Sequence, residues 1–414
     1  AFRIAREGRP GPVLIDLPKD VASALVTPTA SIAPEFRPPT ARIDPTALQQ
    51  ARGLIRAAQQ PLFYTGYGVG VGAAQTELRT LVADTGIPVI STLKGLGGVP
   101  SDDASFLGML GMHGSRAANL AVQNCDLLIC VGARFDDRAT GKLSEFAPRA
   151  RVIHLDVDPA EVSKLRRADV RLIGELRTLL PLLDCRPQIT AWQRQCAQWR
   201  AQSQPRYDAP GASIYAPALL RRLSEQAPAD TVVACDVGQH QMWVAQYYKF
   251  DQPRRWINSG GLGTMGVGLP YAMGVKMARP DSEVYCVTGE GSVQMCIQEL
   301  STCLQYSLPV NVILLNNRYL GMVRQWQELL YQGRYSQTYM DALPNFAKLA
   351  EAYGHVGMLI ERPQDVEPAL REARKLKDRT VFMDFRTDPT ENVFPMVPGG
   401  KGLTEMVLSA EGLE

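Results

Sequence analysis

Two short apolar runs that each end in polar residues constrain the fold of this 414-residue chain more than any other feature. The first run, 284–287, leads into Gly-Glu-Gly-Ser, and the second, 310–315, leads into a pair of asparagines. Buried parallel strands read as continuous apolar runs, and a helix between two such strands brings their carboxyl ends to the same edge of the sheet. The spacing therefore predicts that Glu290 and Asn317 converge at the ligand-binding edge of a parallel α/β sheet.

The residue types at this edge indicate a metal-bound diphosphate. A carboxylate (Glu290) beside an amide oxygen (Asn317) suits Mg²⁺, which takes few protein ligands and completes its shell from phosphate or water. Gly289 and Gly291 let backbone amides approach a phosphate, and we expect Ser292 to open a helix whose N-terminus favours an anion. A structural turn without a ligand is the alternative, because short motifs also match by chance.

Helix-like and strand-like segments alternate in two blocks, which predicts an α/β protein with two doubly wound parallel-sheet domains. We expect a central domain at 44–185 and a C-terminal domain at 213–414, with a helical connector at 186–212. The proline- and glycine-rich stretch from Glu391 to Gly402 is expected to be irregular and to fold over a site.

The first residues read as the end of another domain. Residues 2–8 suggest a helix and residues 11–18 a buried strand, followed by a proline-rich linker that we place at 21–43. They look like the edge of a domain, and we expect further residues of that domain to precede them.

Composition excludes several classes of function. Lys and Arg number 44 against 42 Asp and Glu, and no basic block suggests a nucleic-acid partner. No apolar stretch is long enough to span a bilayer, and the N-terminus lacks a signal-peptide pattern. The eight cysteines have no zinc-like spacing and lie mostly in apolar runs, which favours buried thiols and a cytoplasmic location.

Two further segments are expected at the same edge of the C-terminal sheet. Gly238, Gln239 and His240 follow the strand-like residues 231–235, where the polar side chains can donate to diphosphate oxygens. Met265 lies inside a glycine-rich loop and could wedge between two rings of a bent cofactor. The alternatives are a solvated histidine and an ordinary core methionine.

The chain resembles acetohydroxyacid synthase, also called acetolactate synthase, over nearly its whole length. The arrangement around Glu290 is similar to the thiamine diphosphate signature, which has aspartate at this position. The other motifs that carry the resemblance lie at 92–97, 108–114, 132–138, 238–243, 320–327 and 391–398.

The resemblance implies thiamine diphosphate, Mg²⁺ and a structural FAD as cofactors. It implies that Glu290, Asn317 and the carbonyl of Tyr319 bind the metal, and that Met265 is the wedge. The residues it assigns to the diphosphate cofactor are Gly238, Gln239, His240, Gly263, Gly289, Gly291, Ser292, Gly321 and Met322. Those it assigns to FAD are Gly66, Gly68, Thr92, Leu93, Lys94, Met109, Gly111, His113, Gly132, Arg134, Asp156, Asp158 and Glu175.

Read without the family, two of the FAD segments carry only weak signals. The glycines of 66–70 after a strand suit either a dinucleotide or a plain turn. Asp156 after its strand suits a ribose hydroxyl, although solvation at the surface is commoner for aspartate.

The implied reaction decarboxylates pyruvate and ligates the hydroxyethyl unit to a second 2-ketoacid, pyruvate or 2-ketobutyrate, in branched-chain amino acid biosynthesis. By resemblance, Arg138 holds the second ketoacid's carboxylate and Trp326 lines its pocket, whereas a surface arginine and a core tryptophan are the plain readings. The family implies a homodimer or tetramer and a possible regulatory subunit.

Two rival functions remain open, one within enzymes and one outside them. A related thiamine diphosphate-dependent decarboxylase or pyruvate oxidase would share the diphosphate site, and a non-catalytic cofactor-binding subunit would suit the unusual Glu290. In the family an N-terminal pyrimidine-binding domain supplies a glutamate that protonates the aminopyrimidine ring, and the resemblance implies that residues 1–20 are the C-terminal remnant of that domain. We therefore expect this chain, as an N-terminally truncated form, to have little or no activity alone.

Overall fold

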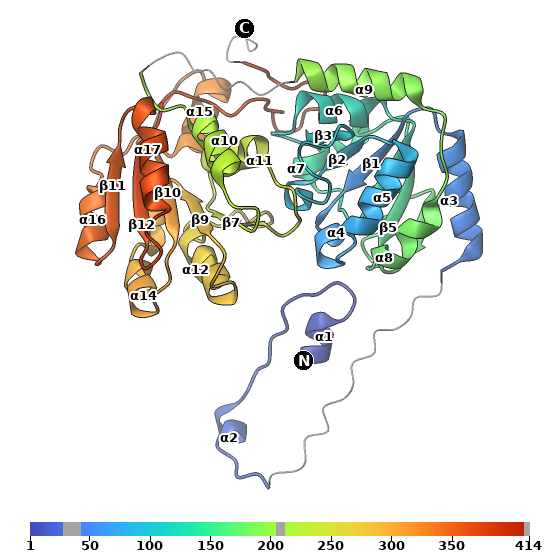
Figure 1. Cartoon of the computed structure of the whole chain (residues 1–414). Coiled ribbons are helices and arrows are strands. Elements are labelled where there is room, and N and C mark those ends of the chain that lie inside the picture. The colour runs from blue at the N-terminus through green and yellow to red at the C-terminus, as the bar shows by residue number, and fades with distance from the viewer. Residues whose placement is uncertain (28–42, 204–211, 410–414) are drawn as a thin grey trace.

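The computed structural model describes residues 1–27, 43–203 and 212–409. Within these residues the chain forms two α/β units, each built on a six-stranded parallel sheet with helices on its faces (Figure 1). The expected fold class, two doubly wound parallel-sheet domains, is confirmed.

The central sheet has the strand order β3-β2-β1-β4-β5-β6, so the winding reverses between β1 and β4. Ligands of doubly wound sheets bind in the crevice at such a reversal. The strands are β1 (Pro61–Thr65), β2 (Val89–Ser91), β3 (Phe106–Met109), β4 (Leu127–Val131), β5 (Arg151–Asp156) and β6 (Val170–Ile173).

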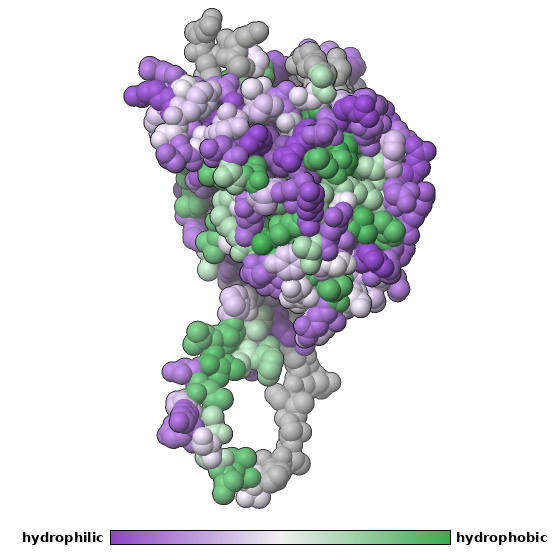
Figure 2. Space-filling model, turned by 90° about the vertical axis from the view of Figure 1, so that its left-hand side faces the viewer, coloured by the Kyte–Doolittle hydropathy of each residue, from purple (hydrophilic) through white to green (hydrophobic). Residues whose placement is uncertain are grey.

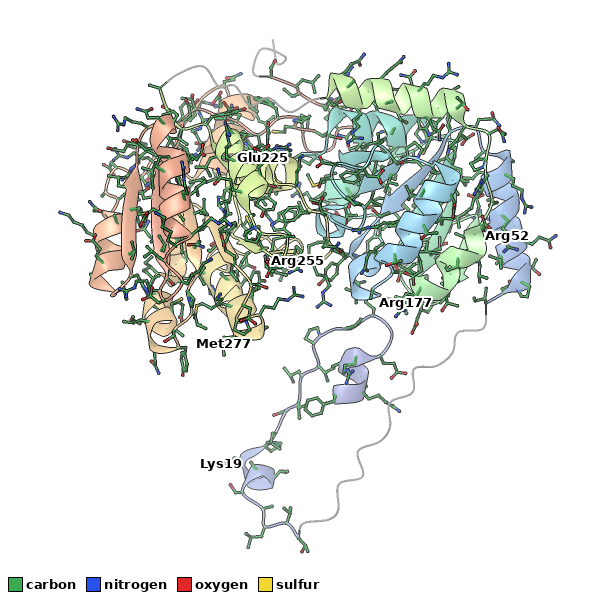
Figure 3. The ribbon with its side chains drawn as sticks, in the orientation of Figure 1. Lys19, Arg52, Arg177, Glu225, Arg255 and Met277 are labelled. Atoms are coloured by element: carbon green, nitrogen blue, oxygen red, sulfur yellow. The ribbon has the colours of Figure 1, made fainter. Side chains whose placement is uncertain are left out.

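Amphipathic helices cover both faces of the central sheet. Arg52 on α3, labelled in Figure 3, donates from Nε to the carbonyl of Leu182 at 2.7 Å and so ties this helix to the end of the domain. Trp192 on the connecting helix α9 donates from Nε1 to the carbonyl of Pro61 at 2.9 Å. The helices are α3 (Pro45–Ala57), α4 (Tyr67–Val71), α5 (Gln75–Thr85), α6 (Arg116–Asn124), α7 (Asp137–Thr140), α8 (Leu176–Leu179) and α9 (Thr190–Gln202).

The C-terminal sheet has the order β11-β12-β10-β9-β7-β8, and its winding reverses between β7 and β9. Every strand pair in it is parallel, with Cys235 on β7 opposite Val287 on β9 and Leu314 on β10 opposite Thr288. The strands are β7 (Val232–Cys235), β8 (Trp256–Asn258), β9 (Val284–Thr288), β10 (Asn311–Asn316), β11 (Val356–Ile360) and β12 (Val381–Arg386).

The helices of the C-terminal unit complete its core. On one face, the rings of Phe346 and Phe382 stack with centroids 6.0 Å apart inside a fully apolar cluster. The helices are α10 (Ala216–Gln226), α11 (Gln239–Tyr247), α12 (Gly268–Ala278), α13 (Glu290–Val293), α14 (Glu299–Gln305), α15 (Gly321–Leu330), α16 (Phe346–Ala352) and α17 (Pro363–Ala373).

The apolar runs of the sequence predict the interior strands but not the edge strands. The predicted strands lie at 61–64, 87–90, 126–131 and 151–156 in the central domain and at 231–235, 283–287, 310–315 and 380–383 in the C-terminal domain. β3 and β6 are the outer strands of the central sheet, and β8 and β11 are those of the C-terminal sheet. An edge strand has a neighbour on one side only, so it needs fewer apolar residues than a central strand. β11, for example, is largely half-buried, whereas β9 is buried throughout.

The N-terminal segment departs from expectation. The helix begins as predicted (α1, Phe2–Arg6), but the predicted buried strand at 11–18 is wrong, because those residues pair with no strand. Its apolar side chains are exposed, Leu14 to 89%, and Figure 2 shows this apolar loop extending from the polar body. A short helix, α2 (Lys19–Ala22), follows. The linker prolines 28, 34, 38 and 39 and connector residues 204–211 lie outside the described residues.

The two units are joined through the irregular C-terminal segment. Val397 donates its backbone N–H to the carbonyl of Met112 at 2.8 Å, and Lys142 donates to that of Lys401 at 3.0 Å. From the other unit, Gln246 on α11 donates through Nε2 to the carbonyls of His113 and Phe394, at 2.9 and 3.1 Å. The prediction that this segment is irregular is confirmed.

The structure also bears on what the sequence predicted for the cysteines and for membrane-spanning segments. All eight cysteines are free and buried, as their apolar surroundings indicated. Among the helices of residues 1–27, 43–203 and 212–409, none is long and apolar enough to cross a bilayer.

Gly97 tests the contact between the units. Its backbone has φ +87°, and a Cβ there would lie 2.2 Å from the carbonyl oxygen of Gln252, so Gly97→Ala combines backbone strain with a clash. We expect the substitution to lower the free energy of unfolding by about 1–3 kcal/mol, measured by urea denaturation.

Gly53→Ala is the matched control. Gly53 lies inside helix α3 and a Cβ there would meet nothing within 4 Å. Alanine is a better helix former than glycine, so the free energy of unfolding of this variant should rise by up to about 1 kcal/mol. Equal behaviour of the two alanine variants would contradict the role given to Gly97.

Candidate functional site

A pocket lies at the carboxyl edge of the C-terminal sheet, where β7, β9 and β10 end. It forms at the reversal of winding between β7 and β9. The residues that line it are Val237, Gly238, Gln239, His240, Trp243, Met265, Gly289, Glu290, Gly291, Ser292, Leu315, Asn317, Tyr319, Leu320, Gly321, Met322 and Val323. The structure thus gathers the residues expected for the metal and diphosphate into one cavity, except Gly263, while their individual roles stay predictions.

Glu290 and Asn317 converge on the turn that follows β10. Asn317 Oδ1 accepts the backbone N–H of Tyr319 at 3.0 Å. The backbone amides of Arg318 and Tyr319 also donate to the Glu290 carboxylate and lower its pKa. Arg318 holds this turn with φ +65°, an unusual conformation for a side chain other than glycine. The turn therefore places the carboxylate, the amide oxygen and the Tyr319 backbone at one point.

The Glu290 carboxylate is 1% exposed, and its Oε1 has no hydrogen-bond partner. Burial raises the pKa of Glu290 to about 7, while nearby backbone amides counteract the shift. A buried carboxylate oxygen without a partner is costly, and a cation would relieve that cost. No cluster of three or more His, Cys, Asp or Glu suited to a metal occurs in the described part of the chain. A cation here would therefore take further oxygens from a ligand, as Mg²⁺ does with diphosphates.

The helix after β9 starts earlier than expected. α13 begins at Glu290 with Gly289 as its N-cap, so the expectation that Ser292 opens the helix is wrong by two residues. The hydroxyl of Ser292 donates instead to the carbonyl of Val237 at 3.1 Å, which ties the ends of β9 and β7 together.

His240 faces the same pocket from α11. Its ring is buried and Nε2 has no partner, and burial lowers the pKa of His240 to about 4, against the opposing charge of Asp236. The ring packs under the glycine turn, where a Cβ on Gly289 would lie 3.1 Å from it. A neutral imidazole with one free nitrogen is thus available to a ligand in the pocket.

Asp236, which the sequence analysis did not single out, fixes the loop that carries Met265. Its carboxylate is fully buried and accepts the backbone N–H of Gly266 at 2.8 Å, that of Gly268 at 3.2 Å and the hydroxyl of Thr288 at 3.2 Å. One side chain therefore joins the ends of β7 and β9 to the loop before α12. An aspartate directly after a strand and just before Gly238 is the signal that could have identified it.

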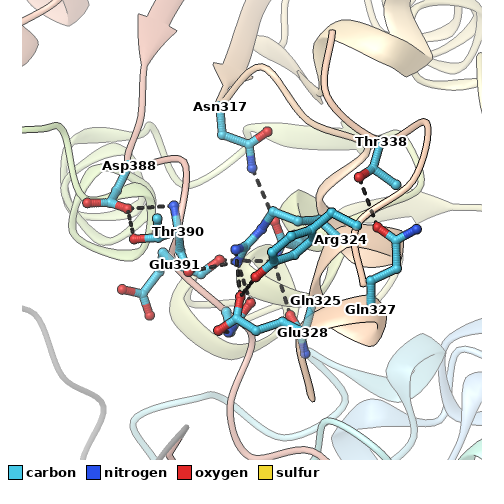
Figure 4. Close-up of polar contacts among 12 residues, drawn as sticks. Asn317, Arg324, Gln325, Gln327, Glu328, Thr338, Asp388, Thr390 and Glu391 are labelled. Atoms are coloured by element: carbon cyan, nitrogen blue, oxygen red, sulfur yellow. Dashed lines mark hydrogen bonds and ion pairs between the residues drawn. The ribbon is translucent and has the colours of Figure 1, made fainter. Parts of the chain in front are cut away.

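Helix α15 carries a second group that sequence reasoning missed. Arg324 is 4% exposed, pairs with Glu328, and donates to the carbonyl of Thr390 at 2.7 Å and to Oδ1 of Asn392 at 2.6 Å (Figure 4). Its neighbour Gln325 is fully buried and bonds to the backbone of the same C-terminal segment. These residues fasten the segment beside the pocket.

Arg138 and Trp326 do not line the main pocket. Arg138 lies in a second cavity with Met112 and residues 397–400 of the C-terminal segment, and its side chain is 64% exposed. Its ion-pair partner, Asp137, lies 4.0 Å away at the surface, so the guanidinium is accessible to another carboxylate. Trp326 on α15 is half-buried, with Nε1 buried and unpartnered. Their joint role in binding a second ketoacid stays a prediction.

In the central domain, the glycines expected near FAD meet one another at the β1/β4 reversal. Gly66 donates its N–H to Val131 and Gly68 donates to Gly132, both at 3.0 Å. A Cβ on Gly66 would lie 2.3 Å from the carbonyl oxygen of Gly132, so close packing of the strand ends already requires glycine.

The other residues expected near FAD have varied surroundings. Thr92 caps the turn 93–95 through Gly95 N–H, Lys94 donates to the carbonyl of Asn258 at 2.9 Å, and Asp156 accepts the N–H of Asp158. Burial raises the pKa of Asp156. The rest lie near strand ends or in neighbouring turns: Leu93, Met109, Gly111, His113, Arg134, Asp158 and Glu175.

Two matches establish the class of protein that this fold and site define. Residues 48–183 match the central domain of thiamine pyrophosphate enzymes, and residues 236–385 match their C-terminal TPP binding domain. Thiamine pyrophosphate is another name for thiamine diphosphate. The chain belongs to this enzyme class.

Within the class, the chain belongs to the acetolactate synthase large-subunit family. It is 50% identical to the isozyme 2 large subunit of Escherichia coli over 410 residues, 98% of this chain and 74% of that protein. Identity is 46% to the isozyme 3 large subunit of the same organism over 426 residues, 99% and 74% of the two chains. It is 44% to the large subunit of Mycobacterium tuberculosis over 430 residues, 100% and 69%.

The family's cofactors are thiamine diphosphate, Mg²⁺ and FAD. The described residues fit the first two, because Glu290 Oε1 and His240 Nε2 are buried polar atoms that lack partners in the pocket. Glu290, Asn317 and the Tyr319 carbonyl would hold the metal, and the turns at Gly238 and Gly289 would take the diphosphate.

Gly321 at the start of α15 tests the packing around Asn317. A Cβ on Gly321 would lie 2.0 Å from Gln239 Oε1 and 2.9 Å from Asn317 Nδ2, so Gly321→Ala must displace both amides. We expect Mg²⁺-dependent affinity for thiamine diphosphate to fall roughly 10-fold or more, measured by calorimetric titration. Gly274→Ala on α12, where a Cβ would meet nothing within 4 Å, should leave the affinity unchanged.

His113 should make stability sensitive to acid. Burial lowers its pKa to about 4, against a backbone hydrogen bond to Pro395, whereas the unfolded chain takes up the proton near its ordinary value of 6.5. The contribution of the neutral ring is present above pH 6.5 and is lost as the pH falls toward 4. Because the unfolded chain then binds a proton that the folded chain does not, the free energy of unfolding should be lower by about 2 kcal/mol at roughly pH 5 than at neutral pH.

The uncharged variant His113→Gln should flatten this dependence, because it cannot take up a proton. The measurement is the urea midpoint of both proteins between about pH 7 and about pH 5. An unchanged slope in the variant would show that His113 does not supply the acid sensitivity.

Proposed function

We propose that this chain is the catalytic subunit of an acetolactate synthase, which decarboxylates pyruvate and ligates the resulting two-carbon unit to a second 2-ketoacid. The second ketoacid is pyruvate or 2-ketobutyrate, which places the reaction in the synthesis of branched-chain amino acids. The observation that carries the proposal is the convergence of Glu290 and Asn317 in one pocket with Met265 and the glycine turns.

The cofactor supplies the nucleophile and the electron sink that decarboxylation of pyruvate requires. The protein's part is to bind, orient and enclose it. Asp236 fixes the loop of Met265, whose side chain would support a bent cofactor. His240, with its unpartnered Nε2, would donate to the diphosphate, and Gln239 would lie beside it as part of the pocket wall. The C-terminal segment, held by Arg324 and Gln325, would keep water from this side of the pocket.

For the second ketoacid we propose Arg138 as the carboxylate-binding residue and Trp326 as a wall of its pocket. The accessible guanidinium of Arg138 beside residues 397–400 supports this role, since arginine binds carboxylates in a bidentate manner. FAD is proposed to bind the central domain at the strand ends that follow β1, β2, β4 and β5.

The relatives are named large subunits, so we also propose that a smaller regulatory subunit associates with this chain and that the catalytic chains form a dimer or tetramer. Eight buried free thiols support a reducing, cytoplasmic setting.

The test is acetolactate formation by the polypeptide of the complete reading frame that encodes this chain, supplied with pyruvate, thiamine diphosphate, Mg²⁺ and FAD. Acetaldehyde and acetyl phosphate are assayed beside acetolactate, because a decarboxylase or an oxidase would make those instead. We expect acetolactate as the main product.

Glu290→Gln keeps the size of the side chain and removes its negative charge, so Mg²⁺-dependent binding of thiamine diphosphate should weaken roughly 10-fold or more. Glu145→Gln, a surface carboxylate paired with Lys142 away from the pocket, is the control. The proposal fails if the unsubstituted protein makes no acetolactate and binds no thiamine diphosphate in the presence of Mg²⁺.

A further inference from the structure

Three carboxamide side chains form a continuous chain of hydrogen bonds between the metal site and the C-terminal segment. Asn317 Nδ2 donates to Gln239 Oε1 at 3.2 Å, and Gln239 Nε2 donates to Gln325 Oε1 at 3.0 Å. Gln325 Nε2 donates to the carbonyl of Val393 at 3.1 Å, and Val393 N–H donates back to Gln325 Oε1 at 2.7 Å. All three carboxamides are buried.

The direction of this row of hydrogen bonds is fixed where Gln325 meets the C-terminal segment. A carboxamide can be turned over so that its oxygen and nitrogen exchange places, and only its partners decide which orientation is stable. Gln325 faces both backbone groups of Val393, of which the N–H can only donate and the carbonyl can only accept. Its oxygen must therefore point to the Val393 N–H, and its nitrogen to the carbonyl.

The orientation of Gln325 agrees with that of the next two side chains, each of which also has a backbone partner of fixed polarity. Its oxygen requires a donor, so Gln239 must present nitrogen, which also donates to the carbonyl of Glu391 at 3.0 Å. Gln239 then offers its oxygen to Asn317, which must present nitrogen on that side. The Asn317 oxygen is left facing the turn where it accepts Tyr319 N–H beside the Glu290 carboxylate.

We propose that Gln325 is a positioning residue for metal binding: through Gln239 it adds the fixed polarity of the backbone at Val393 to the hydrogen bond from Tyr319 N–H, and together they keep the oxygen of Asn317, rather than its nitrogen, toward the cation. This inference rests on the proposed thiamine diphosphate and metal site. A cation binds an amide oxygen and is repelled by an amide NH₂, so the orientation of Asn317 is as important as its position. Docking of residues 391–393 thereby becomes a condition for a complete metal site.

The first test compares two glutamines of the same helix, both labelled in Figure 4. Gln325→Met keeps the length of the side chain but removes its polar atoms. Gln327→Met is the control, because Gln327 bonds to Ser336 and Thr338 and takes no part in the carboxamide chain. Mg²⁺ is titrated in saturating thiamine diphosphate, and binding is followed by the change in intrinsic tryptophan fluorescence, to which Trp243 in the pocket contributes.

We expect Gln325→Met to weaken Mg²⁺ binding roughly 10-fold, as loss of an outer partner of a metal ligand typically does. Gln327→Met should change it by no more than about twofold. Equal Mg²⁺ affinity of the two methionine variants would overturn the inference and leave the proposed function intact. Absence of Mg²⁺-dependent binding in the unsubstituted protein would overturn both.

A double-mutant cycle separates orientation from general loosening of the C-terminal segment. Asn317→Asp replaces the amide by a carboxylate, which presents oxygen to the cation whichever way it is turned. In that background Gln325→Met should change Mg²⁺ affinity by no more than about twofold, because no orientation is left to lose. The same roughly 10-fold loss in both backgrounds would mean that Gln325 acts only by holding the segment, and would sink the proposal.

Discussion

The parallel alignment of β7, β9 and β10 is the constraint on which the rest of the site depends. Because the three strands run in the same direction in register, their polar ends emerge at one edge, where the winding of the sheet reverses. The buried carboxylate of Asp236 then ties two of those ends to the loop of Met265. A one-residue shift of β9 would turn its buried side chains to the other face and move Glu290 away from Asn317.

A polar site in the interior is stable only if its groups are paired. The carboxamides of Asn317, Gln239 and Gln325 satisfy one another and end on the backbone of the C-terminal segment, so that most of this cluster costs little to bury. Among the described residues that line the pocket, the buried side-chain atoms without a partner are Glu290 Oε1 and His240 Nε2. The pattern of pairing thus separates the groups that support the site from those left for a ligand.

The accuracy of the sequence analysis followed the depth of burial. Interior strands such as β4 and β9 are continuous apolar runs that few other structures could accommodate, and they were located correctly. The short edge strands β3, β6, β8 and β11 have a neighbour on one side only and carry a weaker pattern, so they were missed. The apolar run at 11–18 also suggests a strand, yet it pairs with no strand and lies exposed. Pairing depends on a partner that a local pattern cannot reveal.

The sequence by itself determined the fold class, the edge at which the ligand site lies and the residue types gathered there, since strand periodicity and the glycine turns are local properties. It did not reveal that Asp236 holds the Met265 loop, or that Gln325 joins the metal site to Val393. It also grouped Arg138 with Trp326, although only Arg138 lines the cavity beside residues 397–400. Only the tertiary structure decided these relations, because each joins segments tens of residues apart, and the orientation of a side-chain amide depends on which donors and acceptors the folded chain brings to it.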